Sequence, residues 1–377
     1  MVALADIVQR YGAAYRAKYG ERLLPSHRKV LRNVARCRTP ALGGHVYTCE
    51  TCDETHYRYH SCRDRHCPQC QHAKGQRWLI KQQALLPATH YFMLTFTLPQ
   101  ELRRVVRSHQ RLCYQVLFRT SAAAAQTLAQ ESRFVGGRLG MVGVLHTWGR
   151  NLSYHPHVHY VVPGGGLTAD GVWQPARKNF LLPVKALSQV FRAKFRDALR
   201  QQAPELFAEI PAAVWEKAWV VHSQPVGRGL RALKYLAPYI FCVAISNRRI
   251  ERLQHGKVLF RYRKSDTGTF RTCRLPAEEF LRRFLQHVLP KGFVKVRYYG
   301  FLAPGCRPLL AGLHQQLGSL ATEQPAAAAG ANAVEPATEP NAPAQPEVRC
   351  PTCGRPMQCR ALPPAKPRPR GRCPPPI

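Results

Sequence analysis

The sequence predicts an α+β fold that contains an antiparallel hairpin. Bulky apolar residues dominate residues 91–98, which is typical of a buried strand. Residues 140–148 and 157–162 have the pattern of two more strands joined by a short polar turn, so they are expected to pair as a hairpin. Helices are expected before and after this hairpin, over residues 100–131 and 187–202. Periodicity indicates the fold class but leaves the order of the strands open.

The remaining elements follow from the same periodicity and from breaks at proline. The first 36 residues are expected to be helical on both sides of Pro25, and a helix over residues 71–86 is expected to stop at Pro87. After the hairpin we expect, in order, a strand over 219–226, a helix from about Leu230, a strand over 257–263 and a helix over 277–289. These elements place a sheet-containing domain after a helical N-terminal part.

Composition divides the chain into four parts. Residues 1–86, in which six cysteines lie between Cys37 and Cys70, are expected to form a helical and zinc-binding domain, and residues 87–320 the α+β domain. Residues 321–348 are mostly Ala, Pro, Glu and Asn and cannot bury enough apolar surface to offset chain entropy, so they are expected to be a flexible linker. Residues 349–377 form a basic, Pro-rich tail with four cysteines, which is expected to be either disordered or folded as a zinc knuckle.

The charge of the chain indicates its partner and its compartment. The 377 residues carry 56 Lys and Arg against 21 Asp and Glu, a formal net charge of +35. Such an excess repels itself unless a polyanion neutralises it, which makes nucleic acid the expected partner. The longest apolar stretch, around residues 239–245, is far shorter than the roughly 20 residues of a membrane span. Because residues 1–17 also lack the pattern of a signal peptide, we expect a cytoplasmic protein with no membrane partner.

The cysteines predict a structural zinc site. Disulfides are disfavoured in the reducing cytosol, so a cluster of cysteines there needs another explanation. Cys49-x2-Cys52 and Cys67-x2-Cys70 are separated by fourteen residues, within one of the spacing typical of a four-cysteine zinc site. These four cysteines are therefore the predicted ligands of Zn²⁺. Competing ligands, which could also hold a second ion, are Cys37, His45, Cys62 and His66; in the tail, Cys350-x2-Cys353 could form a further knuckle with Cys359 and Cys373.

Histidines in the predicted hairpin indicate a second kind of metal site. His157 and His159 stand two apart, which on a strand places both imidazoles on one face. Paired imidazoles suit a divalent ion such as Mn²⁺, but a third ligand is needed. His146 on the facing strand falls roughly opposite Val158 and is the expected third ligand, with His155 as its rival.

Two tyrosines downstream are candidates for chemistry. Tyr235 and Tyr239 stand four residues apart, on one face of the expected helix. Such an aromatic pair is more often core packing, and Pro238 would kink or end the helix between them. Charge alone suggests these basic DNA contacts: Arg150, Arg231, Lys234, Arg248, Arg249 and Arg252.

Taken together, the motifs resemble the rolling-circle insertion-sequence transposases, which are double-tyrosine members of the HUH endonuclease class. The resemblance rests on the order of a cysteine module, Thr-Trp-Gly, His-Pro-His-Val-His and Tyr-Leu-Ala-Pro-Tyr, and it covers about residues 20–305. It implies a ferredoxin-like antiparallel sheet with packed helices, His157 and His159 as metal ligands, and Tyr235 and Tyr239 as nucleophiles.

The resemblance also implies an activity. The protein would be a DNA transposase that nicks and rejoins single-stranded DNA at element ends through a 5′-phosphotyrosine, assisted by Mg²⁺ or Mn²⁺. Its expected partners are single-stranded DNA, transposon ends and target DNA, with no small-molecule substrate. Two alternatives stay open: a replication initiator or relaxase with the same chemistry, and a non-enzymatic zinc-ribbon protein that binds nucleic acid.

Overall fold

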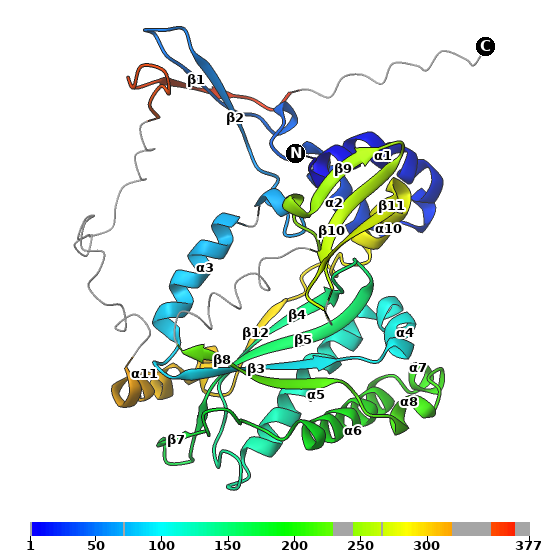
Figure 1. The fold of residues 1–377 in the computed structure, drawn as a ribbon, viewed down its shortest axis with the longest axis vertical. Coiled ribbons are helices and arrows are strands. Elements are labelled where there is room, and N and C mark those ends of the chain that lie inside the picture. Colours follow the sequence, from blue (N-terminus) through cyan, green and yellow to red (C-terminus); the bar gives the residue numbers. More distant parts are fainter. Residues whose placement is uncertain (1, 71, 229–243, 265–266, 319–347, 366–377) are drawn as a thin grey trace. The chain divides into compact units, whose positions relative to one another are not determined.

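The computed structural model describes residues 2–70, 72–228, 244–264, 267–318 and 348–365 (Figure 1). The chain divides into two compact units. Unit 1 contains residues 71–325 with the first two residues, and unit 2 contains residues 3–70 with residues 326–377. The predicted linker lies outside the described residues except for Val348, and so does the helix expected from Leu230.

A five-stranded antiparallel sheet forms the centre of unit 1, with the strand order β12-β4-β5-β3-β8. Its strands and the two helices between them are, in chain order, β3 (His90–Thr97), α5 (Gln110–Ala129), β4 (Met141–Trp148), β5 (Tyr154–Pro163), α6 (Val184–Gln202), β8 (Val221–Arg228) and β12 (Val296–Tyr299). The succession β3-α5-β4-β5-α6-β8 is the β-α-β-β-α-β order of a ferredoxin-like fold. The predicted fold class and sheet are therefore confirmed, with β12 as an added edge strand.

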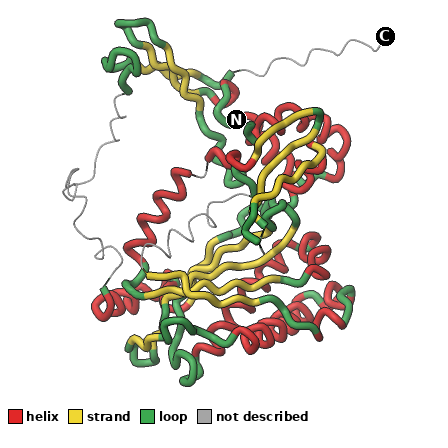
Figure 2. The backbone as a smooth tube through the Cα atoms, in the orientation of Figure 1, coloured by secondary structure: helices red, strands yellow, loops and turns green. Residues whose placement is uncertain are grey.

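Helices cover one face of this sheet. Helices α5 and α6 lie along that face and pack on each other (Figure 2). Beneath them, alternate residues of the central strands are buried, namely Phe92, Leu94 and Phe96 on β3 and Tyr160 on β5. This alternation is the reason that residues 90–97 form a strand with one face towards the helices.

The opposite face carries a second apolar cluster and the histidines. The cluster includes Met93 on β3, Val144 on β4 and Val161 on β5. Because strand side chains alternate between faces, His157 and His159 lie on the side of Val161, away from α5 and α6. The sheet therefore separates the histidines from the helical layer.

Smaller elements surround this sheet in unit 1. A separate three-stranded antiparallel sheet consists of β9 (Ile250–Gln254), β10 (Lys257–Arg263) and β11 (Phe270–Pro276), in the order β11-β10-β9. It packs on α10 (Ala277–Leu285) through Phe260 and Phe280, whose ring centroids are 5.9 Å apart. The other α-helices and strands among the described residues of unit 1 are α3 (His72–Leu85), α4 (Arg103–Ser108), β6 (Gly165–Leu167), β7 (Trp173–Pro175), α7 (Pro204–Ala208), α8 (Ala213–Glu216) and α11 (Arg307–Leu317).

Unit 2 combines two helices with a small sheet. Helices α1 (Leu4–Tyr19) and α2 (Pro25–Arg36) confirm the helices expected on both sides of Pro25, and they pack on each other. The sheet has the order β13-β1-β2 and consists of β1 (Gly44–Thr48), β2 (Thr55–Tyr59) and β13 (Gln358–Leu362). Residues 349–365 of the tail are thus structured, because β13 pairs antiparallel with β1.

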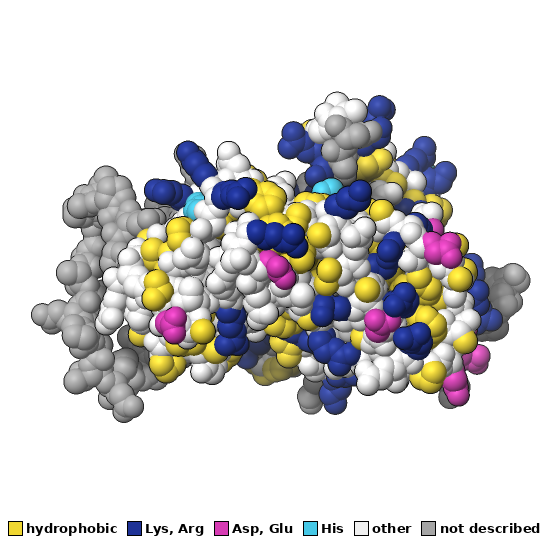
Figure 3. Space-filling model, turned by 90° about the horizontal axis from the view of Figure 1, so that it is seen from below, with side chains coloured by type: hydrophobic (Ala, Val, Ile, Leu, Met, Phe, Trp, Pro, Cys, Tyr) yellow, Lys and Arg dark blue, Asp and Glu magenta, His cyan; other side chains and the backbone are white. Residues whose placement is uncertain are grey.

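The charge of the surface relates to the expected DNA partner, and the length and apolarity of the helices relate to the membrane. Figure 3 shows Lys and Arg side chains spread over the face that it draws, among few Asp and Glu side chains. Among the described residues, no helix is long and apolar enough to cross a membrane.

Candidate functional site

Three histidines converge on the sheet of unit 1. His146 on β4 pairs directly with His157 on β5, and His159 lies on the same face two residues further along. One ring nitrogen from each of the three lies within 4.8 Å of the others. The sequence predicts His146 roughly opposite Val158, and the structure moves it by one residue. That shift puts all three imidazoles on one face, so they could share one metal ion.

Hydrogen bonds orient two of these imidazoles. His157 Nδ1 lies 2.6 Å from the carbonyl oxygen of His155, which only accepts, so Nδ1 carries the proton and Nε2 is left for an ion. His159 Nδ1 lies 2.9 Å from Oγ1 of Thr95 on β3. The third ring, His146, stacks on Trp148 with a centroid distance of 4.7 Å. The histidine centre, meaning His146, His157 and His159, is thus held in place by the sheet itself.

The electrostatics of the centre favour neutral imidazoles. Burial lowers the pKa of His157 well below its usual value, and the neighbouring His159 adds to the effect. Burial, with contributions from His155 and His222, lowers the pKa of His159 to about 4. A metal ion binds the neutral form of histidine, so the ligands need not lose a proton near pH 7.

The rival ligand His155 has a different partner. Its Nδ1 lies 3.0 Å from Nη2 of Arg103, at the start of α4, and it is not among the three histidines that converge. Burial and the charge of Arg103 lower the pKa of His155. Sequence reasoning missed both Arg103 and Thr95, because their approach to the histidines depends on strand order and on the position of α4.

Both predicted nucleophiles, Tyr235 and Tyr239, and two of the predicted DNA contacts, Arg231 and Lys234, fall outside the described residues. Of the predicted DNA contacts that the structure describes, Arg150 and Arg249 donate hydrogen bonds to backbone carbonyl oxygens. Arg150 Nη1 donates to the carbonyl oxygens of Arg263 and Lys264 at 3.1 Å each. Arg249 Nε donates to the carbonyl oxygen of Arg261 at 3.0 Å, whereas Arg248 is exposed. Arg150 and Arg249 therefore fix the end of β10, whatever else they contact.

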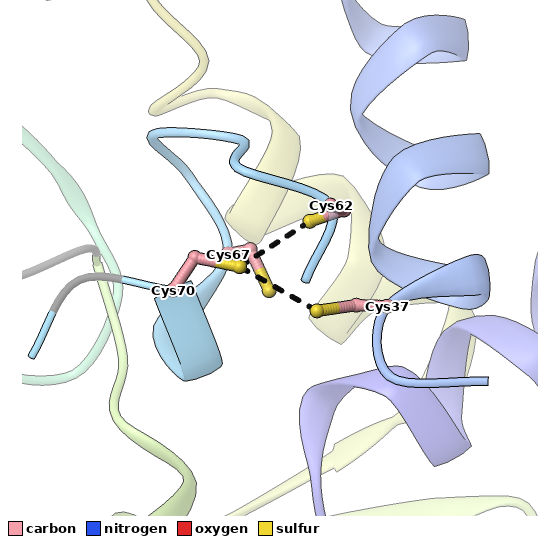
Figure 4. A group of neighbouring side chains, drawn as sticks. All are labelled: Cys37, Cys62, Cys67 and Cys70. Carbon is pink, nitrogen blue, oxygen red and sulfur yellow. Dashed lines mark hydrogen bonds between the residues drawn. The ribbon is translucent and has the colours of Figure 1, made fainter. Parts of the chain in front are cut away.

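The eight cysteines of interest form two groups within unit 2. The first group, which we call the basal group, contains Cys37, Cys62, Cys67 and Cys70 (Figure 4). Cys70 Sγ lies 3.5 Å from Cys37 Sγ and 3.6 Å from Cys62 Sγ. The second group, which we call the tip group, contains Cys49, Cys52, Cys350 and Cys353. In each group, the four sulfur atoms all lie within 4.8 Å of one another.

This grouping corrects the predicted ligand set. Cys49 and Cys52 do not share a site with Cys67 and Cys70; each pair is completed by two other cysteines. The reason is the β1–β2 hairpin, which has Cys49 and Cys52 in its turn and the basal group at its open end. Strands of five residues at about 3.3 Å per residue separate the two ends by about 16 Å, too far for one ion. The predicted competitors His45 and His66 belong to neither group.

Comparison with known proteins identifies the family. A family model described as "Putative transposase" matches residues 140–308, and one described as "Transposase zinc-binding domain" matches residues 7–98. Putative transposase y4qJ of Sinorhizobium fredii is 41% identical over 320 residues, which cover 79% of this chain and 80% of that protein. The chain belongs to the IS91 family of rolling-circle transposases.

A second relative agrees with this assignment. The transposase for insertion sequence element IS801 of Pseudomonas savastanoi pv. phaseolicola is 32% identical over 286 residues, which cover 71% of this chain and 68% of that protein. No solved structure matches the chain. As an IS91-family transposase, the protein has DNA as its partner. The zinc-binding match ends at residue 98, so it includes the basal group but only half of the tip group.

Proposed function

We propose that this IS91-family transposase nicks and rejoins single-stranded DNA at the ends of its element through a covalent 5′-phosphotyrosine. The observation that carries the proposal is the convergence of His146, His157 and His159 on one face of the sheet. Three imidazoles suit Mn²⁺ better than Mg²⁺, which prefers oxygen ligands. A bound divalent ion would supply Lewis-acid stabilisation of the charge that develops on the scissile phosphate.

The nucleophiles in this proposal are Tyr235 and Tyr239. The phenol oxygen attacks phosphorus, the bond to the 3′ oxygen breaks, and the proton lost by the phenol is balanced by the one gained by the 3′-hydroxyl. Attack of a 3′-hydroxyl on the phosphotyrosine reverses these steps, so strands are rejoined without ATP. Two tyrosines allow one DNA end to be held while another is cut.

Arg103 is a further candidate in the site. Its guanidinium lies beside His155, whose carbonyl oxygen orients His157, so it is adjacent to the histidine centre. A guanidinium can donate two parallel hydrogen bonds to a phosphate. We therefore assign Arg103 to a phosphate of the DNA strand at the cleavage point.

The open face of the β9–β11 sheet supports binding of single-stranded DNA. The register places Arg252, Leu259 and Arg274 in one row across the three strands. On β11, Phe270 is 66% exposed, and the Arg261 guanidinium lies 5.1 Å from its ring centroid. Basic groups beside an exposed aromatic ring match the pattern of phosphate contacts and base stacking. Further contacts proposed from charge alone are Arg231, Lys234 and Arg248.

The test is formation of a covalent adduct. The full-length protein is incubated with Mn²⁺ or Mg²⁺ and labelled single-stranded oligonucleotides that carry the element ends, and the products are separated under denaturing conditions. A labelled protein band that resists denaturation is expected, and the Tyr235→Phe, Tyr239→Phe double variant should abolish it.

A double variant that still forms the adduct would show that another residue is the nucleophile. Absence of any adduct with every element end would instead leave the protein as a DNA-binding transposase component without this chemistry. Tyr262→Phe, on β10, is a control that should keep full adduct formation.

A further inference from the structure

The tip group brings together cysteines from opposite ends of the chain. Cys49 and Cys52 follow β1, whereas Cys350 and Cys353 precede β13, and 298 residues separate Cys52 from Cys350. Cys52 Sγ lies 3.5 Å from both Cys49 Sγ and Cys350 Sγ and 3.7 Å from Cys353 Sγ. Cys49 Sγ lies 3.5 Å from Cys353 Sγ.

These distances match a zinc site. Four sulfurs around a tetrahedral Zn²⁺, at about 2.3 Å from the ion, lie about 3.8 Å from one another. Sulfurs in a disulfide would be about 2.05 Å apart, and all four cysteines are free thiols. The sulfurs need to separate only slightly to hold an ion.

The two halves of the tip group also share one backbone conformation. The N–H of Cys49 donates to the carbonyl oxygen of Glu54 at 2.9 Å, and the N–H of Cys350 donates to that of Arg355 at 2.8 Å. In both cases, the acceptor is five residues after the first cysteine. The N-terminal and C-terminal segments therefore form the same closed turn around their two thiols.

Two more features of the turns agree. The residue after the second cysteine has a positive φ in each, 51° at Asp53 and 73° at Gly354. In each turn, the sulfur of the first cysteine accepts hydrogen bonds from the backbone N–H groups of the second cysteine and of the threonine before it, Thr51 or Thr352. Such donors stabilise a thiolate, which is the form that binds zinc.

The tail makes further contacts with the hairpin. β13 pairs with β1 over five residues, with Tyr47 opposite Cys359. Within the described part of the chain, the apolar cluster around the tip group consists of Tyr47, Met357 and two of its cysteines, with Val348 packed against them. So small a core needs a metal ion to remain folded.

We propose that Cys49, Cys52, Cys350 and Cys353 bind a structural Zn²⁺ that clasps the C-terminal segment onto the N-terminal zinc-binding module. The ion closes two equivalent turns on each other and holds β13 as the third strand of the sheet. Since half of the ligands lie near the C-terminus, the zinc-binding domain of this transposase is complete only when both ends of the chain are present. The proposal does not depend on the nuclease chemistry.

The zinc content of the full-length chain tests the clasp. The Cys350→Ser, Cys353→Ser double variant should contain one zinc equivalent less than the wild type. Cys359→Ser changes an exposed cysteine of the same segment outside the tip group and should lose none. Because the basal group and the histidine centre are unchanged in both variants, the difference reports this site. A double variant with the wild-type zinc content would overturn the proposal.

A second variant and a second measurement guard against loss of folding. Cys353→His keeps a zinc ligand and should retain the full zinc content, whereas Cys353→Ser should not. In the wild type, hydrogen exchange at residues 358–362 should be slow with zinc bound and fast after chelation. Unchanged slow exchange after the zinc has been removed would show that no ion holds the tail.

Discussion

The histidine centre and the cysteine groups are both candidate metal sites, but they are built in opposite ways. The histidines stand on adjacent strands of a five-stranded sheet whose two faces are covered by apolar clusters. The cysteines lie in turns and loops at the two ends of a short hairpin. The difference teaches that a sheet can bring three imidazoles together without a metal ion, whereas we expect a cysteine module with so small a core to need zinc in order to fold.

Removal of zinc should therefore have the largest effect, and only in unit 2. Binding of structural zinc contributes about 10–16 kcal/mol to the folding of small zinc modules, and the few buried apolar side chains of the β13-β1-β2 sheet cannot replace it. After chelation, hydrogen exchange should become fast in residues 44–59 and stay slow in β3, β4 and β5. Equal loss of protection in both units would contradict the comparison.

Loss of one imidazole from the histidine centre should reduce activity but leave the fold of unit 1 intact. His157→Ala should reduce adduct formation about 10³-fold, because transition-state stabilisation by the ion is lost, while the fold is retained. His109→Ala, which changes an exposed histidine between α4 and α5, serves as the control and should keep activity. The measurements are the rate of adduct formation and the thermal unfolding temperature. Unfolding of His157→Ala at a much lower temperature would mean that the imidazole is mainly structural.

Arg103→Ala should have an intermediate effect. Loss of a charge-assisted contact to phosphate should reduce adduct formation about 10- to 100-fold, by a free energy of about 1.5–3 kcal/mol. Arg104→Ala is the matched control, because Arg104 is the exposed neighbour on the same helix. Equal rates for the two variants would remove Arg103 from the site.

Thr95→Val should have the smallest effect of these changes. The substitution should lower the affinity for Mn²⁺. Residues that orient a metal ligand typically change metal affinity about 10-fold or more when they are replaced. Calorimetric titration with Mn²⁺ should show weaker binding in Thr95→Val and near-normal binding in Thr95→Ser, which keeps the hydroxyl. If the Thr95→Val and Thr95→Ser variants bind Mn²⁺ with equal affinity, the hydrogen bond between Thr95 and His159 does not orient this imidazole.

The same contrast explains what the sequence can predict. Strands β3, β4 and β5 are apolar enough to recognise, and the two-residue spacing of His157 and His159 places them on one face. The predicted register of His146 is off by one residue, since it pairs with His157 and not with Val158. The register also shifts between His146 and Trp148, and the spacing of residues along one strand has no information about such a shift.

The cysteine groups cannot be predicted in the same way. β1 and β2 are short, and the side chains of β2 are largely exposed, so they lack the pattern of a buried strand. The pairing of β1 with β13 joins segments about 300 residues apart, and local spacing has no information about such a contact. Spacing therefore identifies the cysteines as candidate ligands, but it groups Cys49 and Cys52 with Cys67 and Cys70, which the structure places in a different group.

The most direct test of the histidine centre is electron paramagnetic resonance of Mn²⁺ bound to the zinc-loaded, full-length protein. We expect one bound Mn²⁺ with nitrogen couplings from coordinated imidazole, and we expect the His146→Ala, His157→Ala double variant to lose them. Mn²⁺ bound without nitrogen coupling, or with the same coupling in the double variant, would contradict the account.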